Sequence, residues 1–411
     1  MLVAFKVLSL PSLMYQTCKQ DGYLAVLITM LVDSVLLWAS IKIIKQARGK
    51  NIYDFIKQYT GKAVAKIFVI ALTLLPLIHL AIKTKGLEWF LLKNLYTKFE
   101  WFQFALPVAL ITCYMIYKGT RNIGRVCEFF VWIIIFGVSI IVIKGFGEVD
   151  WTFFMPILNK GIKPIFSAIY KYLAWFGIGG ELLLLCGSVD FAHEKKSRVF
   201  LYSGIAIVLV QLVLWSFYGA YGIMASTHNF AISDISQISN AKMSLDELSW
   251  LIVSIWAMAQ ILHVAIYGYL FCRGIQLIFN LKNDVVATLV LFVAIIVWIF
   301  WGEHTIALEK LFLHKSIVWI VIVAQYILPL IIFGLSFIKK KSQQNFQVLE
   351  EPKQQVSIKK QNTADVKSNK KLQQQTEIQS KENQQQSGQN NGEVSQSKQK
   401  PKKSRRKYAK V

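Results

Sequence analysis

The sequence predicts an all-α integral membrane protein with a ten-helix, five-plus-five inverted-repeat fold, in which helices 1 and 6 are broken and helix 1 is truncated at the N-terminus. Three observations lead to this prediction. The 411 residues are 55% hydrophobic with a mean hydropathy of +0.44, which is too apolar for a soluble globular protein of this size. Nine apolar runs are long enough to cross a bilayer. One of these runs contains three glycines followed by a carboxylate.

The chain opens with half a membrane span. Its first 23 residues, MLVAFKVLSLPSLMYQTCKQDGY, contain an apolar stretch that includes Lys6 and Pro11, whereas a complete membrane helix needs about 20 apolar residues. The stretch lacks the charged start and the small-residue cleavage site of a signal peptide. We therefore expect only the outer half of a first helix. Either translation starts upstream of Met1, which we favour, or the protein lacks half of its site.

Nine full-length runs follow, and their apolar lengths predict membrane helices at 24–44, 65–85, 102–117, 127–145, 168–188, 199–224, 248–271, 285–301 and 316–338. Lysine and arginine concentrate in alternate loops, which the positive-inside rule places in the cytoplasm. These basic loops lie at 45–66, 118–125, 193–198, 273–282 and 339–341. The outward-facing loops are then 17–23, 86–100, 146–166, 225–247 and 302–315.

The formal net charge of +23 does not indicate a nucleic-acid partner, because much of the excess lies at the C-terminal end. Residues 342–411 are rich in Lys, Gln, Asn and Ser and have few apolar residues to bury. We expect a disordered cytoplasmic tail there, separate from a polytopic membrane domain at 1–341. The terminal stretch KPKKSRRKYAK is either a solvated tail beside the inner leaflet or a binder of anionic membrane lipid or another polyanion.

The run at 168–188 contains FGIGGE, in which Gly177, Gly179 and Gly180 precede Glu181. Each glycine forfeits about 1 kcal/mol of helix propensity and allows backbone conformations closed to other residues. A carboxylate at the bilayer centre costs roughly 2.5–3.5 kcal/mol. Broken helices are tolerated at membrane depth where they line a cavity or are enclosed by protein, and they carry substrate sites in secondary transporters. The alternative is close helix packing through small residues, which explains the glycines but not Glu181.

Other polar side chains lie within the predicted spans. Taken singly, each is better explained by hydrogen bonds between helices than by contact with a ligand. Gln260 and His263 are three residues apart and share one helix face. This set is His79, Lys171, Gln211, Gln260 and His263. Asp33 stands apart from it, because a carboxylate within a span calls for the same explanation as Glu181.

No motif indicates an enzyme. The sequence has no P-loop, no HExxH and no serine nucleophile elbow, and GIGGE lacks the aspartate of the GxGD motif of intramembrane proteases. We expect no catalytic residue, no metal and no cofactor. The cysteines show no metal-ligand spacing and are interpreted as small buried apolar residues; they are Cys18, Cys113, Cys127, Cys186 and Cys272.

Four stretches together resemble a known family: LSLPSLMYQTCKQDGYLAVLI (8–28), YKGTRNIGRVCEF (117–129), FMPILNKGIKPIF (154–166) and FGIGGELLLL (176–185). Their order and spacing are similar to those of the spore germination permeases, the B subunits of nutrient-germinant receptors. That family belongs to the amino acid–polyamine–organocation transporter superfamily, so the resemblance implies its transporter fold. The chain departs from the family in its long tail and in its first helix, where Ala4 and Phe5 stand near the expected glycine.

The resemblance implies a receptor subunit of the spore inner membrane that recognises a small-molecule germinant, an amino acid, and works with A-type and lipoprotein C-type subunits. The ligand-binding residues that it implies are Val7, Leu8 and Ser9 after the first break, and Phe176, Gly177, Gly179, Gly180 and Glu181 at the second. Helix geometry adds Leu77, Ile78, Ala81, Ala257 and Gln260.

Two other functions remain open on the sequence. The chain could be a secondary active transporter that moves an amino acid or an organic cation with a proton or a sodium ion. Glu181 or Asp33 would then be the titrating group. The basic tail also permits a membrane-tethered polyanion binder, and deleting the residues after Lys341 would test that hypothesis.

Overall fold

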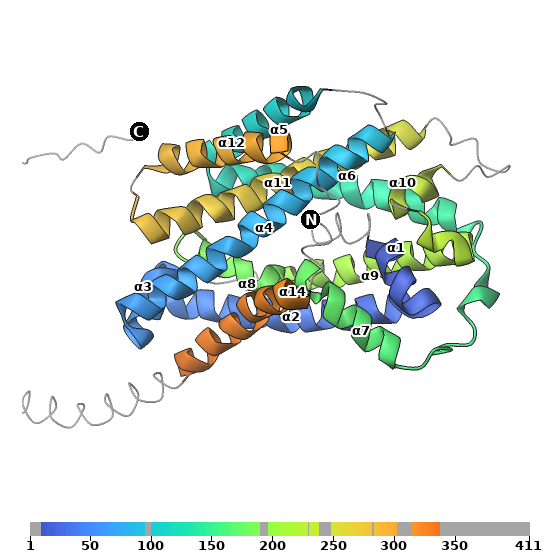
Figure 1. Ribbon diagram of the computed structural model, residues 1–411, viewed down its shortest axis with the longest axis horizontal. Coiled ribbons are helices and arrows are strands. Elements are labelled where there is room, and N and C mark those ends of the chain that lie inside the picture. The colour runs from blue at the N-terminus through green and yellow to red at the C-terminus, as the bar shows by residue number, and fades with distance from the viewer. Residues whose placement is uncertain are drawn as a thin grey trace, which may run out of the picture. The chain divides into compact units, whose positions relative to one another are not determined.

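The computed structural model describes residues 10–94, 100–189, 196–228, 230–237, 248–281, 283–301 and 315–337. Within these ranges every regular element is helical (Figure 1). The N-terminal part of the described chain contains α1 (Leu10–Cys18), η1 (Lys19–Asp21), α2 (Gly22–Ala47), α3 (Ile52–Thr60), α4 (Lys62–Asn94), α5 (Trp101–Tyr117) and α6 (Thr120–Phe146). Next come η2 (Trp151–Phe154), α7 (Lys163–Tyr172), η3 (Leu173–Trp175), α8 (Ile178–Glu181) and η4 (Leu182–Leu185).

The remaining elements are α9 (Lys196–Tyr221), η5 (Gly222–Ser226), α10 (Ala231–Ser236), α11 (Leu248–Phe279), α12 (Asp284–Trp301), α14 (Lys315–Ile322) and η7 (Val323–Ile327). The last of these is a short π-helix, and α-helix resumes at 328–337. The predicted tail at 342–411 lies outside the described residues.

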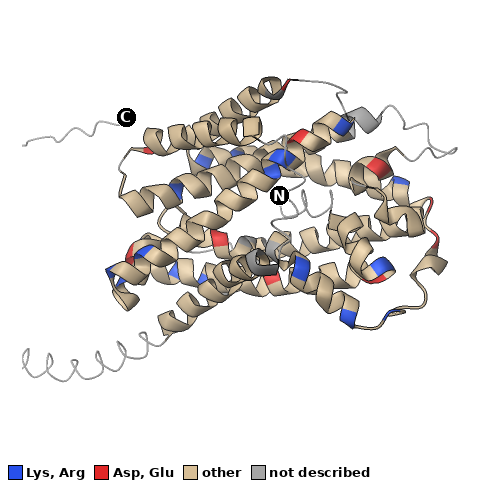
Figure 2. Ribbon diagram, in the orientation of Figure 1, with Lys and Arg blue, Asp and Glu red and all other residues tan. Residues whose placement is uncertain are grey.

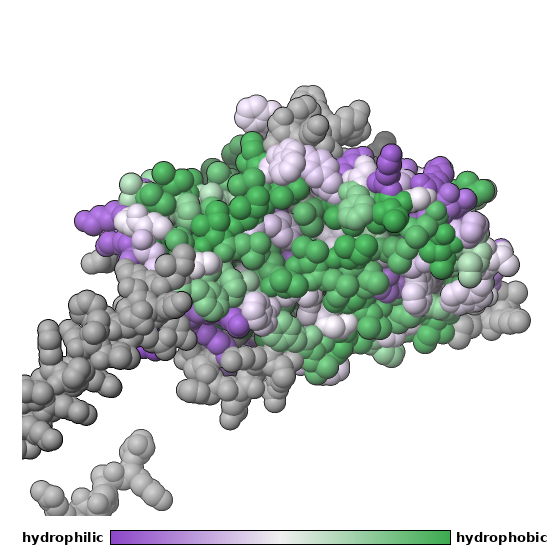
Figure 3. Space-filling view, turned by 90° about the horizontal axis from the view of Figure 1, so that it is seen from below, coloured by the Kyte–Doolittle hydropathy of each residue, from purple (hydrophilic) through white to green (hydrophobic). Residues whose placement is uncertain are grey.

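Seven stretches of the described chain are helical, long enough and apolar enough to cross a membrane. Their interiors carry few charged residues, so most of each ribbon is neither acidic nor basic (Figure 2). On the face drawn in Figure 3, hydrophobic residues cover the middle and hydrophilic residues gather toward the two ends. The seven stretches are Leu10–Ala47, Lys62–Asn94, Thr120–Phe146, Val199–Ser226, Val253–Phe279, Asp284–Trp301 and Val318–Phe337.

The nine predicted spans all coincide with helical segments. Seven correspond to the stretches above, α5 is a shorter apolar helix, and the span at 168–188 is divided into α7, η3, α8 and η4. α1 has only 9 residues, which is about 14 Å of helix and too short to cross a bilayer alone. The nine predicted runs therefore fit the described residues, and the N-terminal half-span stays a prediction because residues 1–9 lie outside them.

The core is built by long helices that pack in pairs. α4 packs along α11 and α5 packs against α12, while α9 contacts both α2 and α6 (Figure 1). The α4–α11 contact is close, because a β-carbon on Gly274 would lie 2.1 Å from Oγ1 of Thr73. In a five-plus-five repeat, α4 and α11, α5 and α12, and α2 and α9 would be symmetry mates. Their pairing is compatible with that repeat, and the ten-helix inverted repeat itself stays a prediction.

Helix extends into most of the predicted loops, and the predictions of irregular structure at 45–66, 225–247 and 86–100 are wrong for the residues described below. The loop at 45–66 contains α3, which begins where Oδ1 of Asn51 accepts a hydrogen bond from the Asp54 N–H at 2.7 Å. α3 buries Ile52, Phe55 and Ile56, so its apolar face stabilises it against the core. The loop at 225–247 contains the short helix α10.

The third loop, at 86–100, is helical as far as Asn94 because α4 continues past its apolar run. An ion pair of 2.6 Å joins Lys85 to Glu88 one turn later, and Leu87 and Phe90 are fully buried. Buried positions at helical spacing therefore extend the helix beyond the segment that hydropathy alone delimits.

Candidate functional site

The span at 168–188 is broken, as predicted, at Phe176 and Gly177. Helix η3 ends at Trp175, the next two residues are not helical, and α8 begins at Ile178. None of the glycines at 177, 179 and 180 has a positive φ angle. The expectation that they supply backbone conformations closed to other residues is therefore wrong, and another requirement must explain them.

That requirement is space. A β-carbon on Gly177 would lie 1.6 Å from Nε2 of Gln325, and one on Gly180 would lie 2.4 Å from the Gln325 carbonyl oxygen. On the other side, a β-carbon on Gly179 would lie 2.7 Å from the backbone nitrogen of Leu37. The residues at the break therefore pack directly against α2 on one side and η7 on the other. Close packing through small residues explains these glycines.

The Tyr326 hydroxyl bridges the break. It accepts a hydrogen bond from the Gly177 N–H at 3.1 Å and donates one to the Leu173 carbonyl at 3.2 Å. The Gly177 N–H has no backbone partner where the helix is interrupted, and buried backbone groups need a replacement partner, whereas the Leu173 carbonyl also accepts the Phe176 N–H at 3.0 Å. A side chain from η7 therefore stabilises the broken conformation.

Glu181 is fully buried and pairs with His79 of α4. The contact joins Oε1 of Glu181 to Nδ1 of the histidine, and both side chains are inside the protein. Oε2 of Glu181 has no hydrogen-bond partner among the described residues. A buried acceptor without a partner costs about 1–3 kcal/mol, so Oε2 is a group to which a ligand donor can bind favourably.

Helices α11 and α2 bring further polar groups toward this pair. The ring of Tyr267 lies 5.3 Å from that of His79 and is stacked at 6.0 Å with His263. Asp33 is buried on α2, one turn before the Leu36–Leu37 segment that contacts Gly179. Tyr267 lies within electrostatic range of both carboxylates, Glu181 and Asp33. The elements around the break thus place carboxylate, imidazole and phenol groups together inside an apolar protein.

Sequence reasoning missed Gln325. Its side chain is fully buried in η7, and neither Oε1 nor Nε2 has a partner among the described residues. π-Helical turns such as η7 are rare and occur frequently at functional sites. The signal was a glutamine inside an otherwise apolar span, VAQYILPL, but nothing in that stretch indicates which helix it faces.

The other predicted site residues fall into three groups. Phe176 is fully buried at the break, and Ile78 packs, as Trp175 and Ala324 do, against the buried cluster of Leu75 and Val321. Leu77, Ala81 and Ala257 are partly buried, and the Ala81 carbonyl accepts a hydrogen bond from Trp298 of α12 at 2.9 Å. Gln260 and His263 are buried on α11.

Two polar candidates lie on other elements, Lys171 on α7 and Gln211 on α9. Three predicted ligand-binding residues cannot be placed. The Lys171 ammonium lies over the ring of its neighbour Tyr172, 5.2 Å from the centroid. Gln211 is buried on α9. Among the described residues no group of three His, Cys, Asp or Glu side chains could hold a metal ion. The predicted residues Val7, Leu8 and Ser9 lie outside the described part of the chain.

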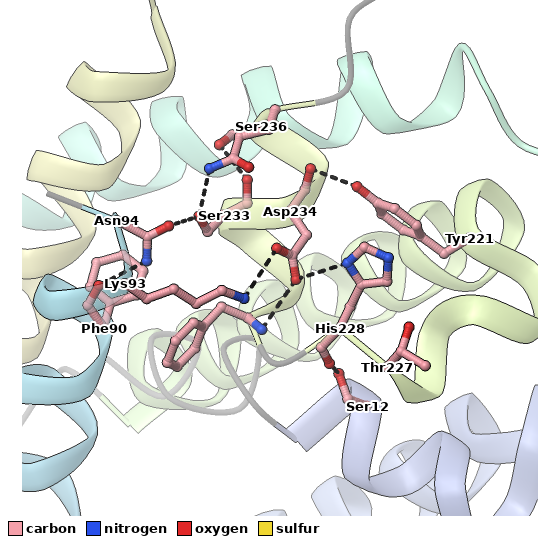
Figure 4. A network of polar contacts seen from close by, with 12 residues as sticks. Ser12, Phe90, Lys93, Asn94, Tyr221, Thr227, His228, Ser233, Asp234 and Ser236 are labelled. Atoms are coloured by element: carbon pink, nitrogen blue, oxygen red, sulfur yellow. Dashed lines mark hydrogen bonds and ion pairs between the residues drawn. The ribbon is translucent and has the colours of Figure 1, made fainter. Parts of the chain in front are cut away.

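A second polar cluster joins α10 to its neighbours (Figure 4). Asp234 is its centre: its carboxylate lies 3.7 Å from Nζ of Lys93 and 3.3 Å from Nδ1 of His228, and it accepts the Phe230 N–H at 3.2 Å. The Tyr221 hydroxyl donates to the Asp234 carbonyl at 2.7 Å. These contacts fix α10 against α4 and the end of α9, and Ser12 of α1 donates to the His228 carbonyl.

Comparison with known proteins identifies the family. A family model described as spore germination protein matches residues 1–307. The chain is also 18% identical over 335 residues to spore germination protein A2 of Bacillus subtilis (strain 168), an alignment that covers 78% of this chain and 87% of that protein. The match to the family model, together with the apolar helices, shows a multi-pass integral membrane protein. The chain belongs to the spore germination protein (spore permease) family.

Proposed function

We propose that this chain is the B-type subunit of a nutrient-germinant receptor in the spore inner membrane, and that it binds an α-amino acid at the break between η3 and α8. The observation that carries the proposal is the fully buried Glu181 at an interrupted membrane helix, with Oε2 left without a partner among the described residues. Family membership supports the germination role.

The chemistry of the break suits an amino acid. An ammonium group can donate a charge-assisted hydrogen bond to Oε2 of Glu181, and such bonds are roughly twice as strong as neutral ones. Phe176 and Ile78 provide apolar surface beside the break, which can sort ligand side chains by size and shape. The residues that we propose for binding are therefore Phe176, Gly177, Glu181 and Ile78, with Gln260 on the facing helix α11.

In this proposal, ligand binding shifts a conformational equilibrium that A-type and C-type subunits detect. A ligand can shift such an equilibrium only by its differential affinity for the two states. The break is suited to this task because α8 contacts α2, α4 and η7, so a change at the break is transmitted to three other helices.

The test uses spores in which the intact receptor carries Glu181→Gln. The germination response is measured against a panel of the twenty common L-amino acids, and the abundance of the chain in the spore membrane is measured in parallel. We expect the half-effective concentration of the active amino acid to rise about tenfold or more, which corresponds to a loss of about 1.4 kcal/mol or more. An unchanged response at normal abundance contradicts the proposal.

A second candidate function is proton-coupled transport of the same ligand. The observation that favours it is the buried Glu181–His79 pair, because ionisable groups inside the membrane commonly relay protons in transporters. Uptake of radiolabelled amino acids into proteoliposomes containing this chain alone separates the two functions. Accumulation that depends on an imposed proton gradient supports the transporter, whereas binding without accumulation supports the receptor.

A further inference from the structure

We propose that the Gln325 carboxamide is a ligand-recognition group at the break, and that its Nε2 donates a hydrogen bond to the carboxylate of a bound α-amino acid. The inference rests on the proposed function, because it assigns a second residue to the same site. It adds a contribution from the last described helix, which sequence reasoning did not include.

The first observation concerns the hydrogen bonding of the Gln325 amide. Gln325 is fully buried, yet neither Oε1 nor Nε2 has a hydrogen-bond partner among the described residues. Gln276 provides a contrast, because its side chain is also buried but its Nε2 donates to Oδ1 of Asp284 at 2.7 Å. Buried polar groups in proteins are nearly always paired, so an unpaired amide at a candidate site indicates a missing partner.

The second observation is the position of the amide. Nε2 of Gln325 lies so close to the backbone of Gly177 that a β-carbon there would be 1.6 Å away. The backbone of the same residue contacts Gly180. Gln325 therefore faces the interrupted segment itself, and the two glycines leave the space that its side chain and carbonyl occupy.

The third observation is the local helix geometry. Gln325 lies in the π-helix η7, between the α-helical residues 315–322 and 328–337. Tyr326, the next residue, binds both backbone groups at the break. The π-helical turn thus presents two consecutive polar side chains to one short segment.

The charges of the Glu181 and Gln325 side chains indicate which end of an amino acid each would bind. Glu181 supplies a negative acceptor, which attracts the ammonium group of a zwitterion and repels its carboxylate. A primary amide has two N–H donors and carries no charge. Gln325 can therefore bind the carboxylate end without cancelling the attraction of Glu181 for the ammonium end.

The experiment compares two buried glutamines in spores that carry the intact receptor. Gln325→Leu is tested against the panel of twenty L-amino acids, and Gln211→Leu is the matched control. Gln211 is also buried with both amide atoms unpaired among the described residues, but it lies on α9, which packs mainly on α2, α6 and α10. We expect Gln325→Leu to raise the half-effective concentration about tenfold and Gln211→Leu to leave it unchanged.

A stability measurement distinguishes recognition from a structural role. Leucine needs no hydrogen-bond partner, so we expect Gln325→Leu to keep or raise the apparent Tm of the purified chain while the response is lost. If the leucine variant does not accumulate in the membrane, the response and the apparent Tm are measured for Gln325→Met, which keeps the length of the side chain.

The outcomes separate this inference from the proposed function. A normal response in Gln325→Leu, with a shifted response in Glu181→Gln, overturns the inference alone. Equal shifts in Gln325→Leu and Gln211→Leu overturn it as well, because the effect would then be general. A wild-type receptor that responds to none of the twenty amino acids overturns both proposals.

Discussion

The side chain of Gln325 occupies the space in which residue 177 would carry a β-carbon, with Nε2 at 1.6 Å from that position. The contact is with side-chain atoms of Gln325 from Cγ outward, whereas β-carbons at 179 and 180 would meet backbone atoms of Leu37 and Gln325. The three glycines therefore differ in how a larger residue can be accommodated.

Alanine substitution of these glycines should produce different losses of stability. We expect Gly179→Ala and Gly180→Ala to destabilise the chain by about 1–3 kcal/mol, because backbone atoms cannot rotate away. Gly177→Ala should be rescued in part by Gln325→Ala, which clears the contact. The apparent Tm of the purified chain in detergent measures each effect.

Gly204→Ala and Gly334→Ala are the matched controls for this series. Both glycines are helical, and apart from their chain neighbours and the backbone of their own helix, no heavy atom of the described chain lies within 4 Å of the point where a β-carbon would stand. Alanine at either position should therefore be neutral or should stabilise the helix by up to about 1 kcal/mol. Equal losses at all five positions would contradict the steric explanation of the break.

The Glu181–His79 pair should show strong coupling. His79→Leu leaves a buried carboxylate without its partner, and breaking a buried pair from one side typically costs about 3–5 kcal/mol. The double variant His79→Leu with Glu181→Leu should be less destabilised than the sum of the single variants. A double-mutant cycle in apparent Tm measures the coupling, and additive losses would show that the pair does not interact.

Tyr326→Phe should weaken the broken conformation. The substitution removes the hydroxyl that accepts the Gly177 N–H and donates to the Leu173 carbonyl. The Leu173 carbonyl keeps the Phe176 N–H, so the Gly177 N–H alone loses its partner, at a cost of about 1–3 kcal/mol. Tyr117→Phe is the control, because its side chain is largely exposed in the described chain. An apparent Tm for Tyr326→Phe that equals the control value would contradict the bridging role.

In the cluster around Asp234, we expect the buried Asp234 to contribute more to stability than the partly exposed Lys93. Asp234→Ala removes the acceptor of the Phe230 N–H together with the contacts to Lys93 and His228, so we expect a loss of about 1–3 kcal/mol. Lys93→Ala should cost less than about 1 kcal/mol, because 40% of the lysine side chain is exposed. Thermal unfolding of the two variants measures the difference, and a larger loss for Lys93→Ala would contradict this ranking.

The sequence predicts the membrane helices well because a bilayer imposes a minimum apolar length on each one. It also predicts the break at Gly177, since three glycines and a carboxylate are incompatible with an uninterrupted lipid-facing helix. It does not predict α3 or the extension of α4, where a few buried positions beyond the apolar runs decide the fold.

The partners at the break could not be predicted, because they come from distant parts of the chain. His79 and Glu181 are 102 residues apart, and Gly177 is 149 residues from Tyr326. Each is recognisable as a polar or small residue in an apolar span, but only the packing of α4, α8 and η7 brings them together. The sequence does not show which helices pack on the break. The glycines therefore suggest unusual backbone conformations, whereas in the structure they allow close contact with neighbouring helices.

The central claim is that the break between η3 and α8 is the ligand site. Equilibrium binding of the radiolabelled active amino acid to purified wild-type and Glu181→Gln receptor, with Asp234→Asn as a control outside the break, tests it most directly. We predict saturable binding to the wild type, a Kd raised about tenfold or more in Glu181→Gln, and an unchanged Kd in Asp234→Asn. The same Kd in folded Glu181→Gln as in the wild type would contradict the claim.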